Sequence, residues 1–173
     1  MTDARYALFA HKPLQGSCVN APAEHWLAVY DADHSHAANR MLHHICAPIF
    51  LIALLGLLWC LPMPAALAAN LASINWATLF AMATVVYYFV MSITLALGSL
   101  PFLVGAMGGI AWLDRVDAPL LLIASVAMLA AALGQFVGHR LEAGGSLFRD
   151  LLYCVIGPIW ALAALYRKLG IPY

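Results

Sequence analysis

Charge is scarce in this sequence and is missing altogether from its middle. Lys, Arg, Asp and Glu make up 9% of the residues, 8 basic against 8 acidic, and none lies within residues 41–113. A soluble domain has about 25% charged residues spread over its surface, and a neutral particle with so few charges would aggregate. We therefore exclude a soluble enzyme, a disordered chain and a nucleic-acid-binding protein, which would need a basic face.

Several familiar sequence signals are also missing. We expect no signal peptide, because Asp3 and Glu24 interrupt the N-terminal stretch and no apolar core lies in its first 20 residues. The four cysteines form no Cys-x-x-Cys pair, so we assign them no disulfide and no zinc. There is no Gly-x-Ser-x-Gly, phosphate-binding loop or His-Glu-x-x-His sequence, and the several histidine boxes of membrane desaturases are absent.

What the sequence has in abundance is apolar residues, at 65% of the chain. They form four segments that we expect to cross a membrane, at 48–69, 76–97, 100–113 and 118–138. The third is short and rich in glycine, and a fifth segment, 151–166, is marginal because Gly157-Pro158 interrupts it. Gly-x-x-x-Gly pairs at 105/109 and 134/138 predict close contacts between helices.

The predicted fold is an all-α, polytopic integral membrane bundle of about four transmembrane helices plus the marginal C-terminal segment. We treat residues 1–173 as one membrane domain, with a polar, histidine-rich region over 1–44 and the bundle over 45–173. The polar region is expected to be interfacial and to hold a short helix from Pro22 to about Tyr30. A second helix is expected to begin with Ser35 as its N-cap.

The distribution of basic residues predicts the orientation. If four segments cross, the N-terminal region and the loop 139–149 share one side of the membrane. That side carries five basic residues, Arg5, Lys12, Arg40, Arg140 and Arg149, and the other side carries only Arg115. The positive-inside rule then predicts a cytoplasmic histidine-rich side, in the inner membrane if the protein is bacterial.

Polar side chains gather at two places where apolar segments meet water. In the first, His36, Asn39 and His43 are spaced i, i+3 and i+7, so they share a face of the expected helix, and His34 lies just before it. In the second, Gln135, His139 and Glu142 are spaced i, i+4 and i+7. Histidine is the commonest neutral nitrogen ligand for iron, zinc and copper. Two such clusters that can meet on one side of a membrane indicate a metal site, although the spacing does not identify the metal.

Two other interpretations stay open at this point. The histidines could be structural, in a small membrane transporter or scaffold. Against ion transport, the apolar spans lack the ionisable groups that such pathways place in mid-membrane. Alternatively, the metal could serve a different lipid hydroxylase or a zinc hydrolase.

Two motifs resemble a known family. The stretch from Tyr30 to Pro48 has the pattern Tyr-x₃-His-x₄-Asn-Arg/Lys-x₂-His-x₄-Pro, and the stretch from Gln135 to Glu142 has the pattern Gln-x-x-Gly-His-x-x-Glu. The tail, with Gly157-Pro158-x-Trp160, is also similar to the family's bacterial members. These features resemble the small membrane proteins typified by the fungal 2-hydroxy fatty acid dioxygenase, over residues 26–171.

The resemblance implies a dioxygenase of fatty acid α-oxidation that uses Fe²⁺ and O₂ to shorten a 2-hydroxy fatty acid by one carbon. It implies three metal ligands, His34, His43 and His139. Glu142 would be a fourth ligand, a partner that orients an imidazole, or a base. Asn39, Gln135 and Tyr30 would hydrogen-bond the ligands or the substrate. Arg40 is the nearest cation in sequence for the substrate carboxylate.

One part of the second motif differs from the family pattern. Relatives have Lys-Pro or Arg-Pro shortly after the glutamate, where this chain has Ala143-Gly144-Gly145-Ser146. A carboxylate contact made by that basic residue would have to come from another cation, and Arg140 and Arg149 are the candidates.

Overall fold

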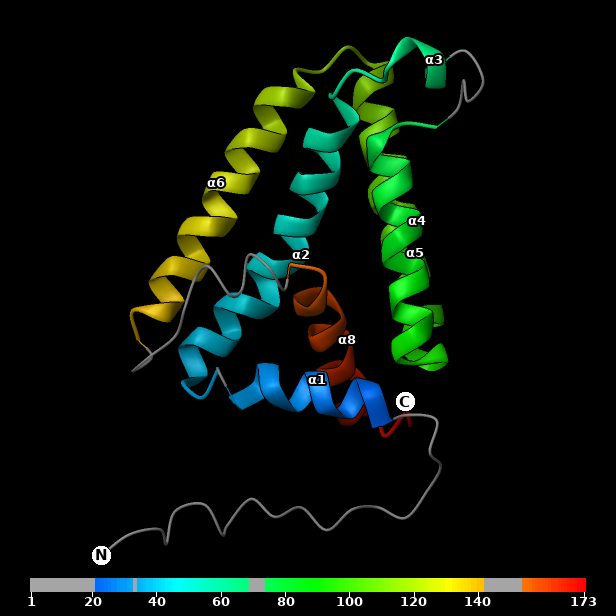
Figure 1. Cartoon of the computed structure of the whole chain (residues 1–173). Helices are drawn as coiled ribbons and strands as arrows, with labels where there is room; N and C mark the ends of the chain where they lie inside the picture. The colour runs from blue at the N-terminus through cyan, green and yellow to red at the C-terminus, as the bar shows by residue number, and fades with distance from the viewer. Residues whose placement is uncertain (1–20, 33, 69–73, 142–153) are drawn as a thin grey trace, which may run out of the picture.

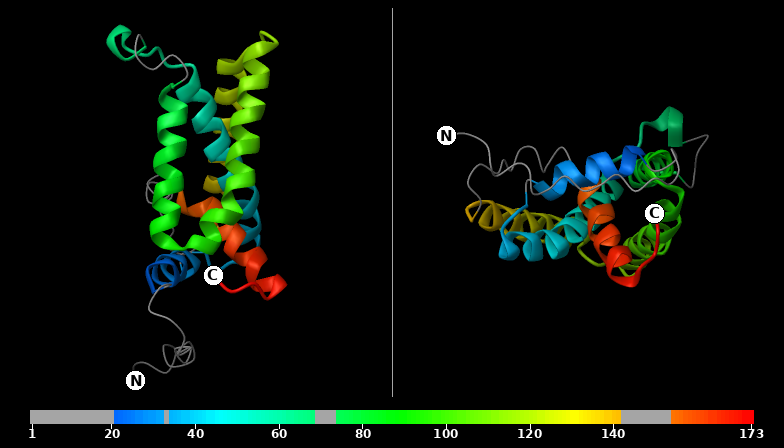
Figure 2. Two further views of the ribbon diagram at one scale, coloured as in Figure 1. Left: turned by 90° about the vertical axis from the view of Figure 1, so that its right-hand side faces the viewer. Right: turned by 90° about the horizontal axis from the view of Figure 1, so that it is seen from below.

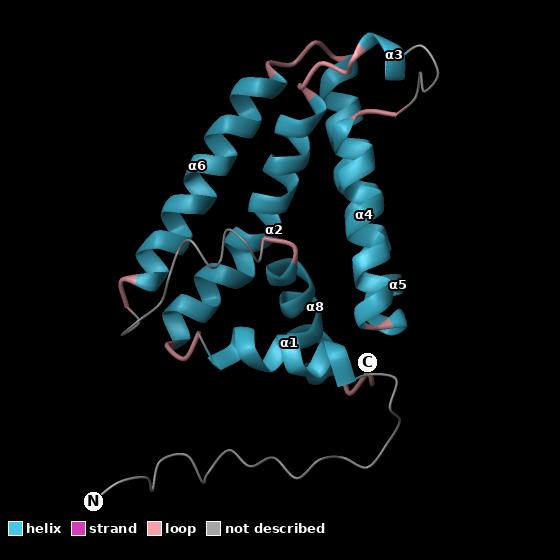
Figure 3. Cartoon of the chain, in the orientation of Figure 1, coloured by secondary structure: helices cyan, strands magenta, loops and turns pink. Residues whose placement is uncertain are grey.

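A computed structural model describes residues 21–32, 34–68, 74–141 and 154–173 of the chain, and every regular element in these ranges is a helix (Figures 1 and 3). The helices are α1 (Ala21–Ala32), α2 (Ala37–Trp59), α3 (Ala65–Ala68), α4 (Trp76–Met91), α5 (Ile93–Arg115), α6 (Leu120–His139) and α8 (Ile156–Leu169). The predicted all-α membrane bundle is confirmed.

Four long helices run alternately up and down along the bundle. In Figure 1, α2 rises, α4 descends, α5 rises again and α6 descends. Helix α1 lies across the end where α2 begins and α6 ends, and α8 packs against α2 and α5 at the same end (Figures 1 and 2). The histidine-rich segment and His139 therefore lie at one end of the molecule, as an even number of crossings requires.

The outer surface of the bundle is apolar. Helices α2, α5 and α6 are long and apolar enough to cross a membrane, and α4 is apolar but shorter, at 16 residues. Exposed side chains on these helices include Val90 and Val104, at 71% and 69% exposure. Exposing such apolar side chains to water is unfavourable, whereas exposing them to lipid is favourable. The structure is therefore compatible with membrane association.

The boundary between the second and third predicted spans was wrong. The break falls at Ser92, whose backbone is extended and whose hydroxyl accepts a hydrogen bond from the Leu95 N–H at 3.4 Å. Helix α5 then continues to Arg115, with Gly98 and Pro101 inside it. Gly98 leaves room for the Tyr166 side chain of α8, which a Cβ at this position would run into. The segment expected to be too short is thus part of a helix long enough to cross a membrane, and the short helix is α4.

The first predicted span was also misplaced, because α2 is a single helix from the polar segment into the bundle. It begins at Ala37, includes Pro48, and ends at Trp59, ahead of Pro62 and Pro64. Its N-cap is His36, whose Nδ1 accepts a hydrogen bond from the Ala38 N–H at 3.3 Å, and not Ser35. One rigid element therefore carries Asn39 and His43 into the membrane domain.

Small residues let α2 and α6 approach each other closely. A Cβ at Gly134 would meet the Cys46 sulfur, and one at Gly138 would meet the Asn39 side chain. The close contact predicted for the 134/138 pair is confirmed. For Gly105 and Gly109 it is wrong within the described residues, because no heavy atom lies within 4 Å of a Cβ built at either position.

Candidate metal centre

Three histidines from three different segments meet at the end of the bundle crossed by α1. His34 lies between α1 and α2, His43 lies in the second turn of α2, and His139 is the last residue of α6. Their exposed fractions are 0%, 0% and 7%. Ring centroids are 4.2 Å apart for His34 and His43, 5.0 Å for His43 and His139, and 5.6 Å for His34 and His139. One ring nitrogen from each residue lies within 4.8 Å of the others.

The hydrogen bond of His34 determines which of its nitrogens can bind a metal. Its Nδ1 lies 2.7 Å from the backbone carbonyl oxygen of Tyr30. A carbonyl only accepts hydrogen bonds, so Nδ1 carries the proton and donates it. The lone pair of the neutral ring is therefore on Nε2, which is buried. A backbone carbonyl that holds the tautomer of a histidine in this way is typical of metal-binding imidazoles.

Tyr30 also contacts the second histidine. Its hydroxyl lies 3.3 Å from His43 Nδ1, and its ring stacks on the His34 ring with centroids 4.3 Å apart. Nε2 of His43 and Nδ1 of His139 are also buried. Three neutral imidazole nitrogens in a buried position are a donor set that suits Fe²⁺, Zn²⁺ or Cu²⁺. The residues present therefore fit a bound transition metal.

The two other polar members of the motifs are buried beside the histidines. Asn39, fully buried, lies one turn before His43 on α2 and faces Gly138 of α6. Gln135, 6% exposed, lies one turn before His139. This packing explains the glycine of the Gln-x-x-Gly-His-x-x-Glu motif, because a side chain at Gly138 would push Asn39 and α2 away from α6. Asn39 and Gln135 therefore lie where α2 and α6 bring His43 and His139 together.

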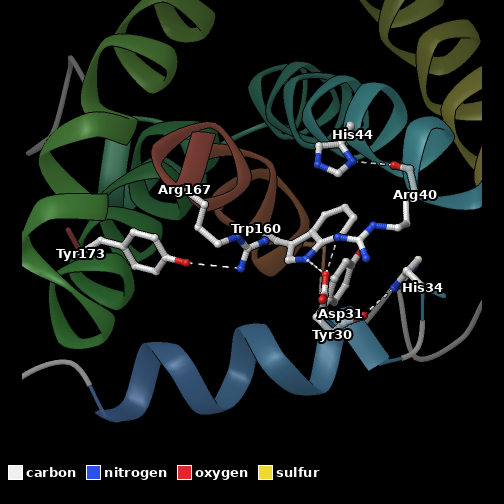
Figure 4. Close-up of polar contacts among 8 residues, drawn as sticks. All are labelled: Tyr30, Asp31, His34, Arg40, His44, Trp160, Arg167 and Tyr173. Atoms are coloured by element: carbon white, nitrogen blue, oxygen red, sulfur yellow. Dashed lines mark hydrogen bonds and ion pairs between the residues drawn. The ribbon is translucent and has the colours of Figure 1, made fainter. Parts of the chain in front are cut away.

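One wall of the site is Trp160, which the sequence interpretation did not single out. It is fully buried, and its ring centroid lies 5.6 Å from that of His34 and 5.2 Å from that of Tyr30. Its Nε1 donates a hydrogen bond to Asp31 Oδ1 at 3.1 Å (Figure 4). The only signal for this role was the Gly157-Pro158-x-Trp160 similarity in the tail, which does not indicate that α8 folds back onto α1.

Arg40 is held at the edge of the site by an ion pair. Its Nη2 lies 2.9 Å from Asp31 Oδ1, and its guanidinium carbon lies 5.7 Å from the Trp160 ring centroid (Figure 4). The side chains of Arg40 and Asp31 are 37% and 36% exposed. Arg40 is thus close to the histidines and already pairs with a carboxylate. Its assignment to the substrate carboxylate remains a proposal.

The neighbouring histidines are not part of the trio. His36 is exposed and caps α2, which separates it from the face shared by Asn39 and His43. His44 donates from Nδ1 to the Arg40 carbonyl at 2.6 Å and packs on Trp160 with centroids 4.2 Å apart. Glu142, the carboxylate expected beside the metal, lies outside the described residues.

The fold and the site together define a helical membrane-type protein with a buried three-histidine cluster at one end of its bundle. A family model described as 2-hydroxy-palmitic acid dioxygenase Mpo1-like matches residues 21–169. The chain belongs to this family. Comparisons with curated proteins and with solved structures gave no significant match.

Proposed function

We propose that this protein is an Fe²⁺-dependent dioxygenase that shortens 2-hydroxy fatty acids by one carbon in fatty acid α-oxidation. The observation that carries the proposal is the His34, His43 and His139 cluster, with one ring nitrogen of each residue within 4.8 Å of the others. The family description, which includes 2-hydroxy-palmitic acid and dioxygenase, supports the substrate class and the use of O₂. Of the candidate metals, ferrous iron with open coordination positions is the one that suits O₂ activation.

The proposed reaction balances without a further reductant. R–CH(OH)–COOH and O₂ give R–COOH, CO₂ and H₂O. The bond between the hydroxyl-bearing carbon and the carboxyl carbon breaks, the former carbon becomes the new carboxyl group, and the latter leaves as CO₂. Four electrons leave these two carbons and reduce both oxygen atoms of O₂. No flavin or nicotinamide is needed.

The side chains have separate tasks in this proposal. Fe²⁺ bound to the three imidazoles would supply O₂ activation and a cation for the hydroxyl and carboxylate oxygens of the substrate. Tyr30 holds His34 in its tautomer through the backbone carbonyl and supports His43 through its hydroxyl. Asn39 and Gln135 provide buried amides for substrate oxygens or histidine ligands. Glu142 is proposed as a further ligand, an orienting group or a base.

The position of the histidine cluster at one end of the bundle supports a lipid substrate. The histidines lie at the end where α1 and α8 cover the bundle, next to helices whose outer surfaces are apolar (Figures 1 and 2). A fatty acid in a membrane keeps its carboxyl group at the interface and its chain among the lipids. The polar end of such a substrate would reach this depth without leaving the bilayer.

Metal analysis of the protein tests the proposal. We expect anaerobic purification in detergent to give about one iron per chain, and O₂ consumption coupled to formation of pentadecanoate from 2-hydroxypalmitate. His34→Ala, His43→Ala and His139→Ala should each reduce bound iron and turnover to background. His25→Ala is the matched control, because His25 is on the exposed face of α1. Protein without iron, or full turnover in the three variants, would contradict the proposal, and zinc in place of iron would favour a hydrolase.

A further inference from the structure

An apolar groove runs between α1, α4 and the start of α8. Its volume is about 380 Å³, within the roughly 300–1,000 Å³ typical of small-molecule sites. The lining residues are Trp26, Phe80, Ala83, Thr84, Tyr87, Val155 and Ile156. Trp26 and Tyr87, at 39% and 37% exposure, lie at its edge. The groove is therefore open along the outer surface of the bundle.

Most of the groove lining is apolar, and its polar side-chain groups are the Thr84 and Tyr87 hydroxyls and the Trp26 indole N–H. The Thr84 hydroxyl donates to the Phe80 carbonyl at 2.9 Å. Next to the groove, the Tyr88 hydroxyl donates to the Val155 carbonyl at 2.6 Å. Because these polar atoms bond to the chain itself, the lining presents mainly aliphatic and aromatic carbon. A ligand that fits it is a hydrocarbon chain.

Short connections lead from this groove to the histidines. Trp26 and Tyr30 are spaced i, i+4, so they are neighbours along one side of α1. Ile156 of the lining precedes Gly157, where a Cβ would come within 3.3 Å of the Tyr30 hydroxyl. The Tyr30 ring in turn stacks on His34. The contacts of Gly157 and Tyr30 therefore connect the α8 end of the groove to the proposed metal centre.

We infer that this groove binds the acyl chain of the 2-hydroxy acid, with the chain's polar end directed past Tyr30 to the histidine cluster. The inference rests on the proposed function, and it adds where the chain lies and which residues limit its length. Trp26, Ala83 and Tyr87 line the groove at positions that a longer chain would pass. Groove length, rather than the metal centre, then determines which chain lengths are good substrates.

Two other hollows fit the acyl chain less well. The apolar groove between α4 and α5 includes Trp59, at the far end of α2 from His43. Sixteen residues of helix separate these two positions, roughly 24 Å at 1.5 Å per residue. The hollow beside α1 and the C-terminus has four charged residues among the seven that line it, Glu24, Asp31, Arg40 and Arg167. Among these three hollows of the described residues, the groove with Ile156 is the one that is apolar and that also lies next to a residue in contact with Tyr30.

Narrowing the groove tests the inference through chain-length preference. Ala83→Trp places an indole in the groove at an exposed position, so folding should be preserved. We expect the KM for 2-hydroxypalmitate to rise about tenfold, the effect of losing roughly two buried methylene groups. The KM for 2-hydroxyoctanoate, the kcat at saturation and the iron content should stay unchanged.

Two matched variants give the controls. Ala130→Trp makes the same change at an exposed position of α6, and Ala111→Trp makes it in the distant α4–α5 groove. Neither should alter chain-length preference. A shift in Ala111→Trp with none in Ala83→Trp would overturn the inference, and so would equal KM changes for short and long substrates in Ala83→Trp.

Photolabelling tests the groove without relying on turnover. A palmitate carrying a diazirine near its methyl end, added to the full-length protein in detergent, should label peptides containing Trp26, Thr84 or Tyr87. Excess 2-hydroxypalmitate should reduce the labelling, and Ala83→Trp should abolish it. Labelling that 2-hydroxypalmitate does not displace would identify membrane lipid as the occupant and overturn the inference. If the groove is labelled and the label displaced but the protein holds no iron, the proposed function fails while the binding site stands.

Discussion

At the scale of single residues, Tyr30 contacts two of the three histidines of the candidate metal centre. Its carbonyl accepts from His34 Nδ1, its hydroxyl lies near His43 Nδ1, and its ring packs against both His34 and Trp160. The carbonyl contact would survive any side-chain substitution, whereas the hydroxyl contact would not. The two contributions can therefore be separated experimentally.

Removing only the hydroxyl of Tyr30 should weaken metal binding and leave the fold intact. Tyr30→Phe keeps the ring that stacks on His34 and removes the oxygen 3.3 Å from His43 Nδ1. Loss of a group that orients a metal-bound histidine typically costs about 10-fold to 100-fold in metal affinity. Competition with a chelator in detergent would measure this loss, with an unchanged thermal unfolding temperature. The control is Tyr173→Phe. In the unchanged protein, the Tyr173 hydroxyl lies outside the site and accepts a hydrogen bond from Arg167 Nη1 at 3.3 Å. Equal metal affinity in both variants would rule out an orienting role.

At the scale of helices, the site depends on how closely α2 and α6 approach each other. Gly134 and Gly138 remove the side chains that would collide with Cys46 and Asn39. The same helices carry His43 and His139, so a wider spacing would pull two candidate ligands apart. Helix packing and metal binding are thus coupled through the same pair of elements.

Adding one methyl group at this contact should destabilise the protein. In Gly138→Ala the new Cβ would meet the Asn39 side chain, and overpacking of this kind typically costs about 1–3 kcal/mol. Thermal unfolding in detergent should show the loss, together with reduced iron content. Gly105→Ala is the matched control, because nothing lies within 4 Å of its added Cβ. That variant should be neutral or more stable by up to about 1 kcal/mol, since alanine favours helix over glycine. Equal stability of the two variants would show that the α2–α6 contact tolerates the methyl group.

At the scale of the whole molecule, the alternation of α2, α4, α5 and α6 predicts that, if all four helices cross a membrane, the two ends of the bundle lie on opposite sides of it. Cys60 follows α2 at the end away from the histidines and is exposed. Lys168 lies in the last turn of α8, at the histidine end (Figure 1). These two positions therefore report on opposite faces.

Labelling of single cysteines should reveal this arrangement. With the other cysteines replaced by serine, Cys60 should react with an impermeant maleimide on the outside of intact cells. Lys168→Cys in a cysteine-free background should react only in inverted vesicles, as the positive-inside rule predicts. Burial and the nearby Asp114 raise the pKa of the Cys60 thiol, so the reaction should be run above neutral pH. Labelling of both positions from one side would contradict four crossings.

The sequence by itself predicted a lipid environment for this protein and the identity of its three candidate metal ligands. Absence of charge from 41–113 is compatible with a lipid environment and unfavourable for a surface in water, and local spacing placed His43 and His139 on polar helix ends. Helix boundaries were less predictable. Ser92 ends one helix and caps the next with its hydroxyl in the middle of an apolar run, whereas Gly98 and Pro101 lie inside a continuous helix. Local propensity favours the opposite result at these positions, and the close approach of Tyr166 to Gly98 is a contact between helices that the local sequence does not reveal.

Only the tertiary structure decided that the histidines meet and what surrounds them. His34 and His139 are far apart in the chain, and their proximity depends on two glycines of α6 that admit Cys46 and Asn39 of α2. Trp160 and Asp31 became part of the site because α8 folds back onto α1, which brings an indole N–H to a carboxylate 129 residues earlier. Local sequence patterns encode helix faces, but contacts between distant faces arise from the packing of the whole bundle, and so the site's walls and its neighbouring groove were visible only in the folded chain.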